Sequence, residues 1–344
     1  MTDENATPTA AGYTMPAEWE SHAGCLMSWP SRAELWRDRL GEAKRDYAAV
    51  AAAIAPFEPV VMACNPGDAA EVRTMCGPGI TPFEVPINDS WSRDNGPTFV
   101  RNPAGDVAVV GFGFNGWGNR WQTYDDDARL PQRVAGWLGL RFFRAPFVLE
   151  GGSFFVDGEG TVITTEQCLL NPNRNPQLSR AGIEQGLNDF LGATTVIWLP
   201  YGHSLDVGPE GTDGHVDVVL QYMSPARVLV EVPSEPTSSE FERGRANVER
   251  LRASRDAAGR PFDIEILDPG SHARVPYANH YLANGAVIVP LGGTDSDVSA
   301  LDTLRDVYHD RKVVGVPGDL IALGGGGPHC ITQQIPAGVE LPVA

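Results

Sequence analysis

Short apolar runs of strand length alternate with segments of helical apolar spacing along most of the chain. The runs that predict strands cover residues 21–30, 59–64, 107–114, 141–148, 161–165, 194–199, 227–232, 262–267, 280–290 and 312–316. Helices are predicted over residues 31–55, 68–75, 127–138, 177–191, 239–256 and 297–308. We also expect an extended segment over 81–101 and a β run over 211–222. This alternation indicates an α/β protein.

The order of these elements indicates a repeated structural unit. A hairpin is predicted over residues 150–165, because Asp157 and Gly158 stand between two β runs. Units of strands and one helix recur about every 60 to 70 residues, a period typical of a closed radial array. We therefore expect one domain over residues 13–344, preceded by a disordered tail over residues 1–12. A doubly wound sheet is the alternative, and the hairpins between the helices argue against it.

The composition restricts the classes of partner. The 344 residues include 26 basic and 44 acidic side chains, which give a formal net charge of −18. Such a surface repels nucleic acids and anionic membranes, and in a general way it favours cationic ligands. The five cysteines are an odd number and form no C-x-x-C pair, which argues for reduced thiols and against disulfides or a cysteine-based zinc site. Because we find neither a leader peptide nor an apolar run of membrane length, we expect a cytoplasmic protein.

A glycine-rich loop near the end of the sequence presents a single thiol. Residues 324–327 are four glycines, followed by Pro328, His329 and Cys330. Glycine backbone can press closely against a ligand, and a thiol becomes a nucleophile when its proton is removed. The loop lacks the Lys-Ser/Thr of a phosphate-binding loop. A buried, inert cysteine in a turn is the simpler interpretation of Cys330 when it is taken alone.

Three further polar segments are flanked by glycine and follow predicted strands. His215 and Asp217 are two residues apart on the predicted β run, so both side chains would point to one face. Asp94 stands beside an aromatic residue at a turn, and Glu150 precedes two glycines. Each of these residues, taken singly, is more simply explained as a surface or turn residue. Together with Cys330 they suggest an active site.

The motifs that contain these residues resemble the agmatine deiminase family of the guanidine-modifying superfamily, which includes bacterial peptidyl-arginine deiminase-type enzymes. The resemblance extends from Met15 to Pro336, nearly the whole chain. It is carried by Trp91-Ser-Arg-Asp-Asn-Gly-Pro, Glu150-Gly-Gly-Ser, Cys168-Leu-Leu-Asn-Pro-Asn-Arg-Asn-Pro, Gly214-His-Val-Asp, Tyr277-Ala-Asn-His-Tyr and His329-Cys-Ile-Thr-Gln-Gln-Ile-Pro. It implies a pentein fold, which is a five-bladed, pseudo-symmetric α/β propeller of ββαβ units around a central active site.

The resemblance also implies roles for individual residues. Cys330 resembles the nucleophile, and His215 the general acid and base. Asp94 and Asp217 resemble the carboxylates that hold the guanidinium group, and Glu150 resembles an acid that orients this centre. The residue types suit the chemistry, because paired carboxylates can bind a planar guanidinium by bidentate hydrogen bonds and place its carbon over the thiolate.

The implied reaction is the hydrolysis of agmatine to N-carbamoylputrescine and ammonia through a covalent amidino-cysteine intermediate. Trp91 and Trp117 resemble aromatic residues of the substrate site. The reaction requires neither a metal nor another cofactor, and its partner is a small cationic guanidine. Members of the family commonly form homo-oligomers.

Several alternatives remain open at the level of the sequence. Gly211 occupies a position where many family members have a glutamate suited to the distal ammonium of the substrate. Another small guanidine, arginine or peptidyl arginine could therefore be the substrate. A substrate carboxylate would call for an arginine near the site, and Arg93, Arg120 and Arg174 are candidates. Amidino transfer to an amine is chemically close to hydrolysis.

Two interpretations other than a deiminase are less well supported by the sequence. The chain could be a catalytically silent binding propeller with a buried Cys330. A metal site could be formed by His203, Asp206, His215 and Asp217, but their spacing matches no common ligand pattern. The aspartates are better suited to binding an organic cation such as a guanidinium group.

Overall fold

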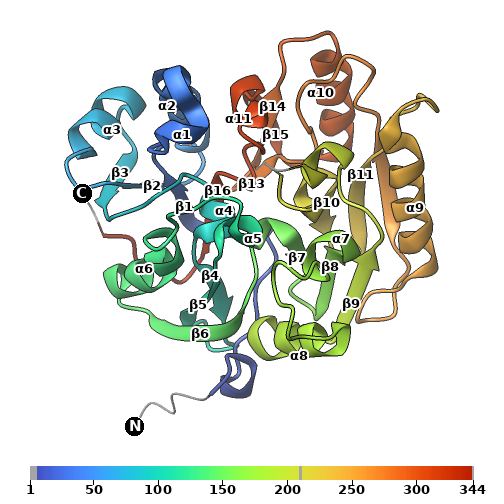
Figure 1. The fold of residues 1–344 in the computed structure, drawn as a ribbon, viewed down its shortest axis with the longest axis horizontal. Helices are drawn as coiled ribbons and strands as arrows, with labels where there is room; N and C mark the ends of the chain where they lie inside the picture. Colours follow the sequence, from blue (N-terminus) through green and yellow to red (C-terminus); the bar gives the residue numbers. More distant parts are fainter. Residues whose placement is uncertain (1–5, 209–210, 343–344) are drawn as a thin grey trace.

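The strands form five small sheets. The structure is a computed structural model that describes residues 6–208 and 211–342. In these residues the strand orders are β16-β1-β2-β3, β4-β5-β6, β7-β8-β9, β10-β11-β12 and β13-β14-β15. We call each sheet with its covering helix a blade. The sheets surround a common centre and the longer helices lie outside them, as Figure 1 shows. The fold is thus the expected α/β propeller of the pentein type.

The elements have the following bounds. The strands are β1 (His22–Ser28), β2 (Val60–Cys64), β3 (Ile80–Glu84), β4 (Thr98–Arg101), β5 (Val107–Gly113), β6 (Arg141–Val148), β7 (Phe154–Val156), β8 (Thr161–Thr165), β9 (Thr195–Leu199), β10 (Leu220–Ser224), β11 (Arg227–Glu231), β12 (Asp263–Leu267), β13 (Tyr281–Ala283), β14 (Ala286–Leu291), β15 (Lys312–Pro317) and β16 (Thr332–Pro336). The α-helices are α1 (Ala33–Trp36), α2 (Leu40–Ile54), α3 (Ala69–Cys76), α4 (Ser92–Asn95), α5 (Gly116–Asn119), α6 (Leu130–Leu138), α7 (Glu166–Leu169), α8 (Arg180–Leu191), α9 (Ser239–Ala253), α10 (Ser296–Val307) and α11 (Asp319–Leu323). The short 3-10 helices are η1 (Thr9–Ala11), η2 (Arg37–Arg39), η3 (Asp127–Arg129), η4 (Gly151–Ser153), η5 (Ser204–Val207) and η6 (Val216–Val218).

Each blade repeats one pattern of connection. An antiparallel pair is followed by a helix, and the chain returns in a strand parallel to the middle one, as in β7, β8, α8 and β9. The central residues of the middle strands β8, β11 and β14 are buried and largely apolar, as expected for strands that are covered on both faces. In the first blade, β16 takes the antiparallel position beside β1, where Leu26 pairs with Gln333. The end of the described chain thereby closes the ring onto its beginning.

Most strands and helices occur where the apolar pattern predicts them, but four expectations are wrong. The helix expected over 31–55 is divided into α1, η2 and α2. The strand expected over 280–290 is the hairpin of β13 and β14. The extended segment 81–101 contains the helical turn α4. The β run over 211–222 begins only at Leu220, because η6 precedes it.

The N-terminal segment is only partly testable. Residues 1–5 of the expected disordered tail lie outside the described residues. Residues 6–12 contradict the expectation, since η1 forms there and the Thr9 hydroxyl donates to the carbonyl of Asn188 at 2.7 Å. None of the helices in the described part of the chain has the length and apolar character of a membrane span.

Candidate active site

The predicted site residues meet at the centre of the ring. A cavity of about 20 Å³ has a wall that includes Trp91, Asp94, Trp117, His215 and Cys330. Their side chains come from loops and short helical turns of different blades, so only the closed fold brings them together. The remaining lining residues are Leu35, Trp121, Thr212, Val218, Gly324 and Gly325.

Cys330 lies in the loop between α11 and β16, with its thiol directed at polar partners. Asn279 donates from Nδ2 to Sγ at 3.1 Å, and the thiol contacts Asp217 Oδ2 at 3.3 Å. A Cβ on Gly326 would lie 2.7 Å from Sγ, so the glycine loop allows the close approach that its sequence suggests. Burial and the two carboxylates of Asp217 and Asp94 raise the pKa of Cys330 well above its usual value. The free protein therefore holds a neutral thiol.

His215 is buried at the start of η6 and faces Asp94. Its Nδ1 lies 3.7 Å from Asp94 Oδ1, and its backbone N–H donates to Asp206 Oδ2 at 3.0 Å. Burial opposes a charge on the imidazole, but Asp94, Cys168 and Asp217 raise the pKa of His215 well above its usual value. Among the described residues, Nε2 has no hydrogen-bond partner. His215 is thus a buried proton donor with one ring nitrogen available.

The two aspartates have opposite electrostatic surroundings. Asp94 accepts hydrogen bonds from Trp117 Nε1 at 2.8 Å and from the Gly152 backbone at 2.9 Å, and burial raises its pKa to about 6. Burial also opposes the charge of Asp217, but His329, at 2.8 Å from Asp217 Oδ2, lowers its pKa. Within the described part of the chain, Asp217 Oδ1 is left without a hydrogen-bond partner. Asp217 is therefore ionised and has one oxygen free for a ligand.

Gly152 stands where the three polar groups converge. A Cβ at this position would lie 2.7 Å from His215 Nδ1 and 2.8 Å from both Asp217 Oδ2 and Asp94 Oδ1. Such distances are shorter than real Cβ contacts, so a side chain would push the groups apart. This close approach explains the second glycine of the Glu150-Gly-Gly motif.

Glu150 lies close to His215, in a cluster of buried residues that the sequence did not predict. Its carboxylate accepts a hydrogen bond from Arg174 Nε at 2.6 Å. Three buried residues, Glu150, Cys168 and His215, lie close together here. A carboxylate oxygen, the sulfur and a ring nitrogen, one from each residue, are all within 4.8 Å of one another. The orienting role of Glu150 stays a prediction, and Arg174 and Cys168 are the residues that would share it.

Aromatic side chains form the other walls. Trp91 is stacked on Trp36, with 6.1 Å between ring centroids and 24° between planes. Trp117 has φ 54° and ψ 55°, a left-handed conformation that a bulky residue adopts only when its surroundings enforce it. Its hydrogen bond to Asp94 and its edge contact with Phe114, at 4.9 Å between centroids, supply that constraint.

The three candidate arginines are already paired with acids. Arg93 contacts Glu18 at 2.9 Å, and Arg174 contacts Asp213 at 2.6 Å as well as Glu150. Arg120 pairs with Asp213 and donates to the carbonyl of Gly211. Since none of these arginines lines the small cavity, the structure offers no free guanidinium there for a substrate carboxylate among its described residues.

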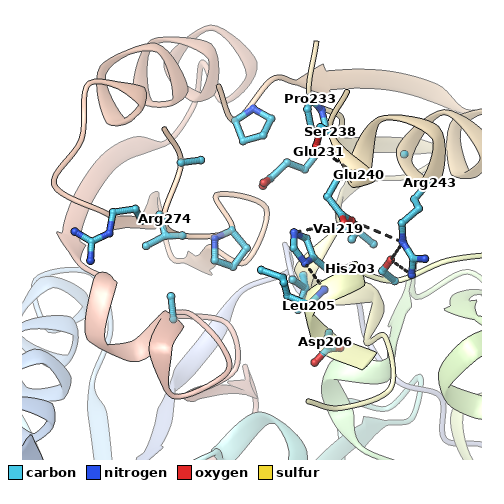
Figure 2. A pocket seen from close by; sticks show the side chains of 18 of the residues that line it. His203, Leu205, Asp206, Val219, Glu231, Pro233, Ser238, Glu240, Arg243 and Arg274 are labelled. Atoms are coloured by element: carbon cyan, nitrogen blue, oxygen red, sulfur yellow. Dashed lines mark hydrogen bonds and ion pairs between the residues drawn. The ribbon is translucent and has the colours of Figure 1, made fainter. Parts of the chain in front are cut away.

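A second cavity of about 1010 Å³ adjoins the first and shares Val218 and Gly325 with it. Figure 2 shows His203, Asp206 and Glu240 along its wall. Both oxygens of Asp206 accept hydrogen bonds from Thr212, and Oδ2 also accepts from the His215 backbone, so Asp206 holds this loop in place. A Cβ on Gly211 would lie 2.0 Å from the Asp206 carbonyl, so a glutamate does not fit this backbone.

Sequence reasoning missed four residues that contact the site. Glu18, Asn279 and His329 each lie within a motif that carries the family resemblance or its boundary, yet the sequence assigns them no role. Cys168 opens another of these motifs, and the sequence assigns it no role in the site either. Their contacts depend on segments more than 40 residues apart, as in the 3.1 Å bond of His329 with Glu18, where the separation is 311 residues.

Comparisons with known proteins identify relatives that match nearly the whole chain. The family model described as Porphyromonas-type peptidyl-arginine deiminase matches residues 14–336. The agmatine deiminase of Pseudomonas aeruginosa is 40% identical over 371 residues, which covers 98% of this chain and 99% of that protein. The agmatine deiminase of Stutzerimonas stutzeri is 39% identical over 370 residues, with coverage of 98% and 99%. Among solved structures, the agmatine deiminase of Enterococcus faecalis superposes with a TM-score of 0.91 at 35% identity, covering 97% of this chain and 99% of that one.

Proposed function

Because the chain belongs to the agmatine deiminase family, a family of hydrolases that act on a guanidino C–N bond, we propose that it hydrolyses agmatine to N-carbamoylputrescine and ammonia with Cys330 as the nucleophile. Both named relatives are called agmatine deiminases and match over almost their full length. The observation that carries the proposal is that Cys330, His215 and Asp94 line one small cavity between aromatic walls, with Asp217 in contact with the Cys330 thiol.

Binding uses charge and shape together. The guanidinium group is planar and permanently charged, and it presents paired N–H donors. Asp217 Oδ1 is free to accept from it, and Asp94 lies across the cavity with two stabilising donors of its own. The tryptophans supply flat apolar walls that suit a delocalised cation. The guanidine carbon is thereby held next to Cys330 Sγ.

The bound cation also activates the nucleophile. Two neighbouring carboxylates raise the pKa of the thiol, and a positive charge between them reverses that effect. Once the thiol has released its proton to solvent, Sγ attacks the guanidine carbon and forms a tetrahedral adduct. His215, protonated in the free protein, gives its proton to the departing nitrogen. The C–N bond breaks, ammonia leaves, and an amidino group remains on Cys330.

Water completes the turnover. The neutral imidazole of His215 removes a proton from a water molecule, and the resulting hydroxide attacks the amidino carbon. The second tetrahedral adduct expels the Cys330 sulfur, which takes up the hydroxyl proton of the adduct, so that the neutral thiol of the free enzyme is restored. The products are N-carbamoylputrescine, ammonia and the free enzyme.

Agmatine is favoured over arginine and peptidyl arginine by the state of the arginines. A substrate carboxylate would need a cationic partner, and Arg93, Arg120 and Arg174 all have acidic partners already. Agmatine has an ammonium group and no carboxylate. The acidic composition of the protein, with a net charge of −18, also suits a dication.

A substrate panel tests the proposal. Purified protein is offered agmatine, arginine, a blocked arginine peptide and guanidinoalkylamines of shorter and longer chain, and the ureido product is measured colorimetrically. We expect agmatine to have the highest kcat/KM and the variant C330S to give no turnover. A higher kcat/KM for arginine or the peptide would overturn the substrate, and turnover by C330S would overturn the nucleophile.

A further inference from the structure

A buried row of alternating charges lies behind Asp217. Arg93 donates from Nη1 to Glu18 Oε1 at 2.9 Å, and His329 Nε2 contacts Glu18 Oε2 at 3.0 Å. The other ring nitrogen of His329, Nδ1, contacts Asp217 Oδ2 at 2.8 Å. The exposed fractions are 2% for Arg93, 4% for Glu18 and 0% for both His329 and Asp217. Buried charges are found in such rows because each one needs a partner of opposite sign.

The row joins segments that are distant in sequence. Glu18 precedes β1, Arg93 lies in α4 next to Asp94, and His329 immediately precedes Cys330. Glu18, Arg93 and His329 are absent from the wall of the small cavity, whereas Asp94 and Cys330 line it. The side chain of His329 reaches the site through its contact with Asp217, and Glu18 reaches it through His329.

The two carboxylate oxygens of Asp217 have different surroundings. Oδ2 receives His329 and also contacts the Cys330 thiol at 3.3 Å, while Oδ1 has no partner among the described residues. An aspartate that is held by one oxygen presents the other in a fixed direction. Without His329, the buried Asp217 would keep only His215 as a neighbouring cation to oppose the repulsion of Asp94.

We propose that Glu18 and His329 are positioning residues, which hold Asp217 in the orientation and ionised state that a guanidinium group requires. The inference rests on the proposed function, because it gives Asp217 a planar cation to bind. Glu18 fixes the imidazole of His329 through Nε2, and Arg93 anchors Glu18 in turn. The charge on His329 is favoured by its two carboxylate neighbours, Glu18 and Asp217, which raise its pKa against the opposing effects of burial and Arg93.

Two substitutions of His329 separate its two contacts. The amide nitrogen of asparagine falls near the Nδ1 position of histidine, and that of glutamine falls near Nε2. H329N therefore keeps a donor to Asp217, whereas H329Q keeps only the contact with Glu18. We expect H329Q to lower kcat/KM for agmatine by about tenfold or more and H329N to retain more activity than H329Q.

A reactivity ratio separates positioning from general damage. Cys330 is alkylated with 2-chloroacetamidine, a planar cation, and with neutral 2-chloroacetamide, and both rates are measured at the Cys330 peptide by mass spectrometry. Loss of Asp217 positioning should slow the cationic reagent selectively, so we expect the rate ratio to fall by about tenfold or more in H329Q and E18Q. His280 supplies the control, because it is buried, bonds to Tyr277 and Tyr308 and does not contact Asp217. H280Q should keep the wild-type ratio.

A double-mutant cycle tests the connection between the two residues. If Glu18 acts only through His329, the variant E18Q/H329Q should be no worse in the rate ratio than H329Q alone. Equal slowing by both reagents, an unchanged ratio in H329Q, or fully additive effects of E18Q and H329Q would each overturn the proposal. If H329Q fails to fold, E18Q carries the same test.

The alkylation experiment also keeps the two proposals apart. A wild-type protein that does not turn over agmatine but reacts preferentially with 2-chloroacetamidine would refute the substrate and still test the row of charges. A wild type that turns over agmatine, with H329Q variants of normal ratio, would refute only the positioning role.

Discussion

Asp94 and Asp217 show how two identical side chains can be given different properties within one cavity. Burial acts on both, but Asp217 has the cationic His329 on one oxygen, and the pKa of Asp94 is raised to about 6. Neighbouring carboxylates with divergent pKa values are a common mark of active sites. Trp117 contributes to this balance, because its indole N–H stabilises the ionised form of Asp94.

Asp94 should control the acidic side of the pH profile. Its carboxylate must be ionised to hold a guanidinium, so kcat/KM should fall as the pH drops through about 6, where Asp94 gains a proton. W117F removes the donor to Asp94 and should raise the pKa further, which moves this limb to higher pH by roughly half a unit to one unit. The measurement is kcat/KM against pH for wild type and W117F.

Trp121 provides the matched control for W117F. It lines the same cavity, and Asp94 has no bond to it among the hydrogen bonds of the described residues. W121F should therefore leave the acidic limb where it is. A limb that moves equally in both variants, or moves to lower pH in W117F, would contradict the assignment to Asp94.

At the scale of single residues, the sequence predicts the residues with a chemical role but not the residues that hold them in place. Cys330, His215, Asp94 and Asp217 stand in glycine-flanked motifs and were found, because their residue types suit a guanidinium. Glu18 and His329 were not assigned roles, since a lone glutamate near the start of a chain has no visible partner. Their bond joins residues 311 positions apart, which no local pattern can indicate.

The hairpin of β13 and β14 shows which secondary-structure elements can be predicted from the sequence. The apolar run over 280–290 predicts one strand, yet Asn284 and Gly285 interrupt it, and an Asn-Gly pair between apolar runs is a strong hairpin signal. Gly285 has φ +75°, the left-handed region that such turns require. By contrast, η6 could not be anticipated, because His215 and Asp217 have the spacing of a strand and only Asp206 and the surrounding loop impose the helical turn.

Two glycine substitutions should have opposite effects on stability. A Cβ would meet nothing within 4 Å at either Gly285 or Gly136, but Gly285 has positive φ and Gly136 lies inside α6. G285A should destabilise the protein by about 1 kcal/mol or more, and G136A should stabilise it by about 0.5 kcal/mol. Thermal unfolding of the two variants beside wild type measures both. An equal or higher melting temperature for G285A would contradict the turn geometry.

The whole molecule is a ring whose closure depends on its last strand. β16 joins the first blade, and the loop that precedes it carries Cys330. Repetition of strands and one helix was readable from the apolar pattern, because each blade buries its own middle strand. The pairing of β1 with β16 could not be predicted in this way, because it joins two segments that are about 300 residues apart and has no counterpart in the repeated pattern.

The net charge of the molecule should influence substrate capture. A protein with a formal charge of −18 attracts agmatine, a dication, and salt screens that attraction over about 10 Å at 0.1 M. We expect kcat/KM for agmatine to fall severalfold between about 0.01 M and about 0.5 M salt, with little change in kcat. Alkylation of Cys330 by neutral 2-chloroacetamide is the control and should be insensitive to salt. A kcat/KM that is constant or rises with salt would exclude electrostatic attraction.

The covalent intermediate on Cys330 is the central claim, and mass spectrometry after rapid acid quenching tests it most directly. During turnover of agmatine, the peptide that contains Cys330 should gain the mass of agmatine less ammonia, and C330S should show no adduct. Cys168 is the other thiol close to His215, so its peptide is followed in the same digest. Ureido product formed with no adduct on Cys330 at any quench time, or an adduct on Cys168 instead, would contradict the mechanism.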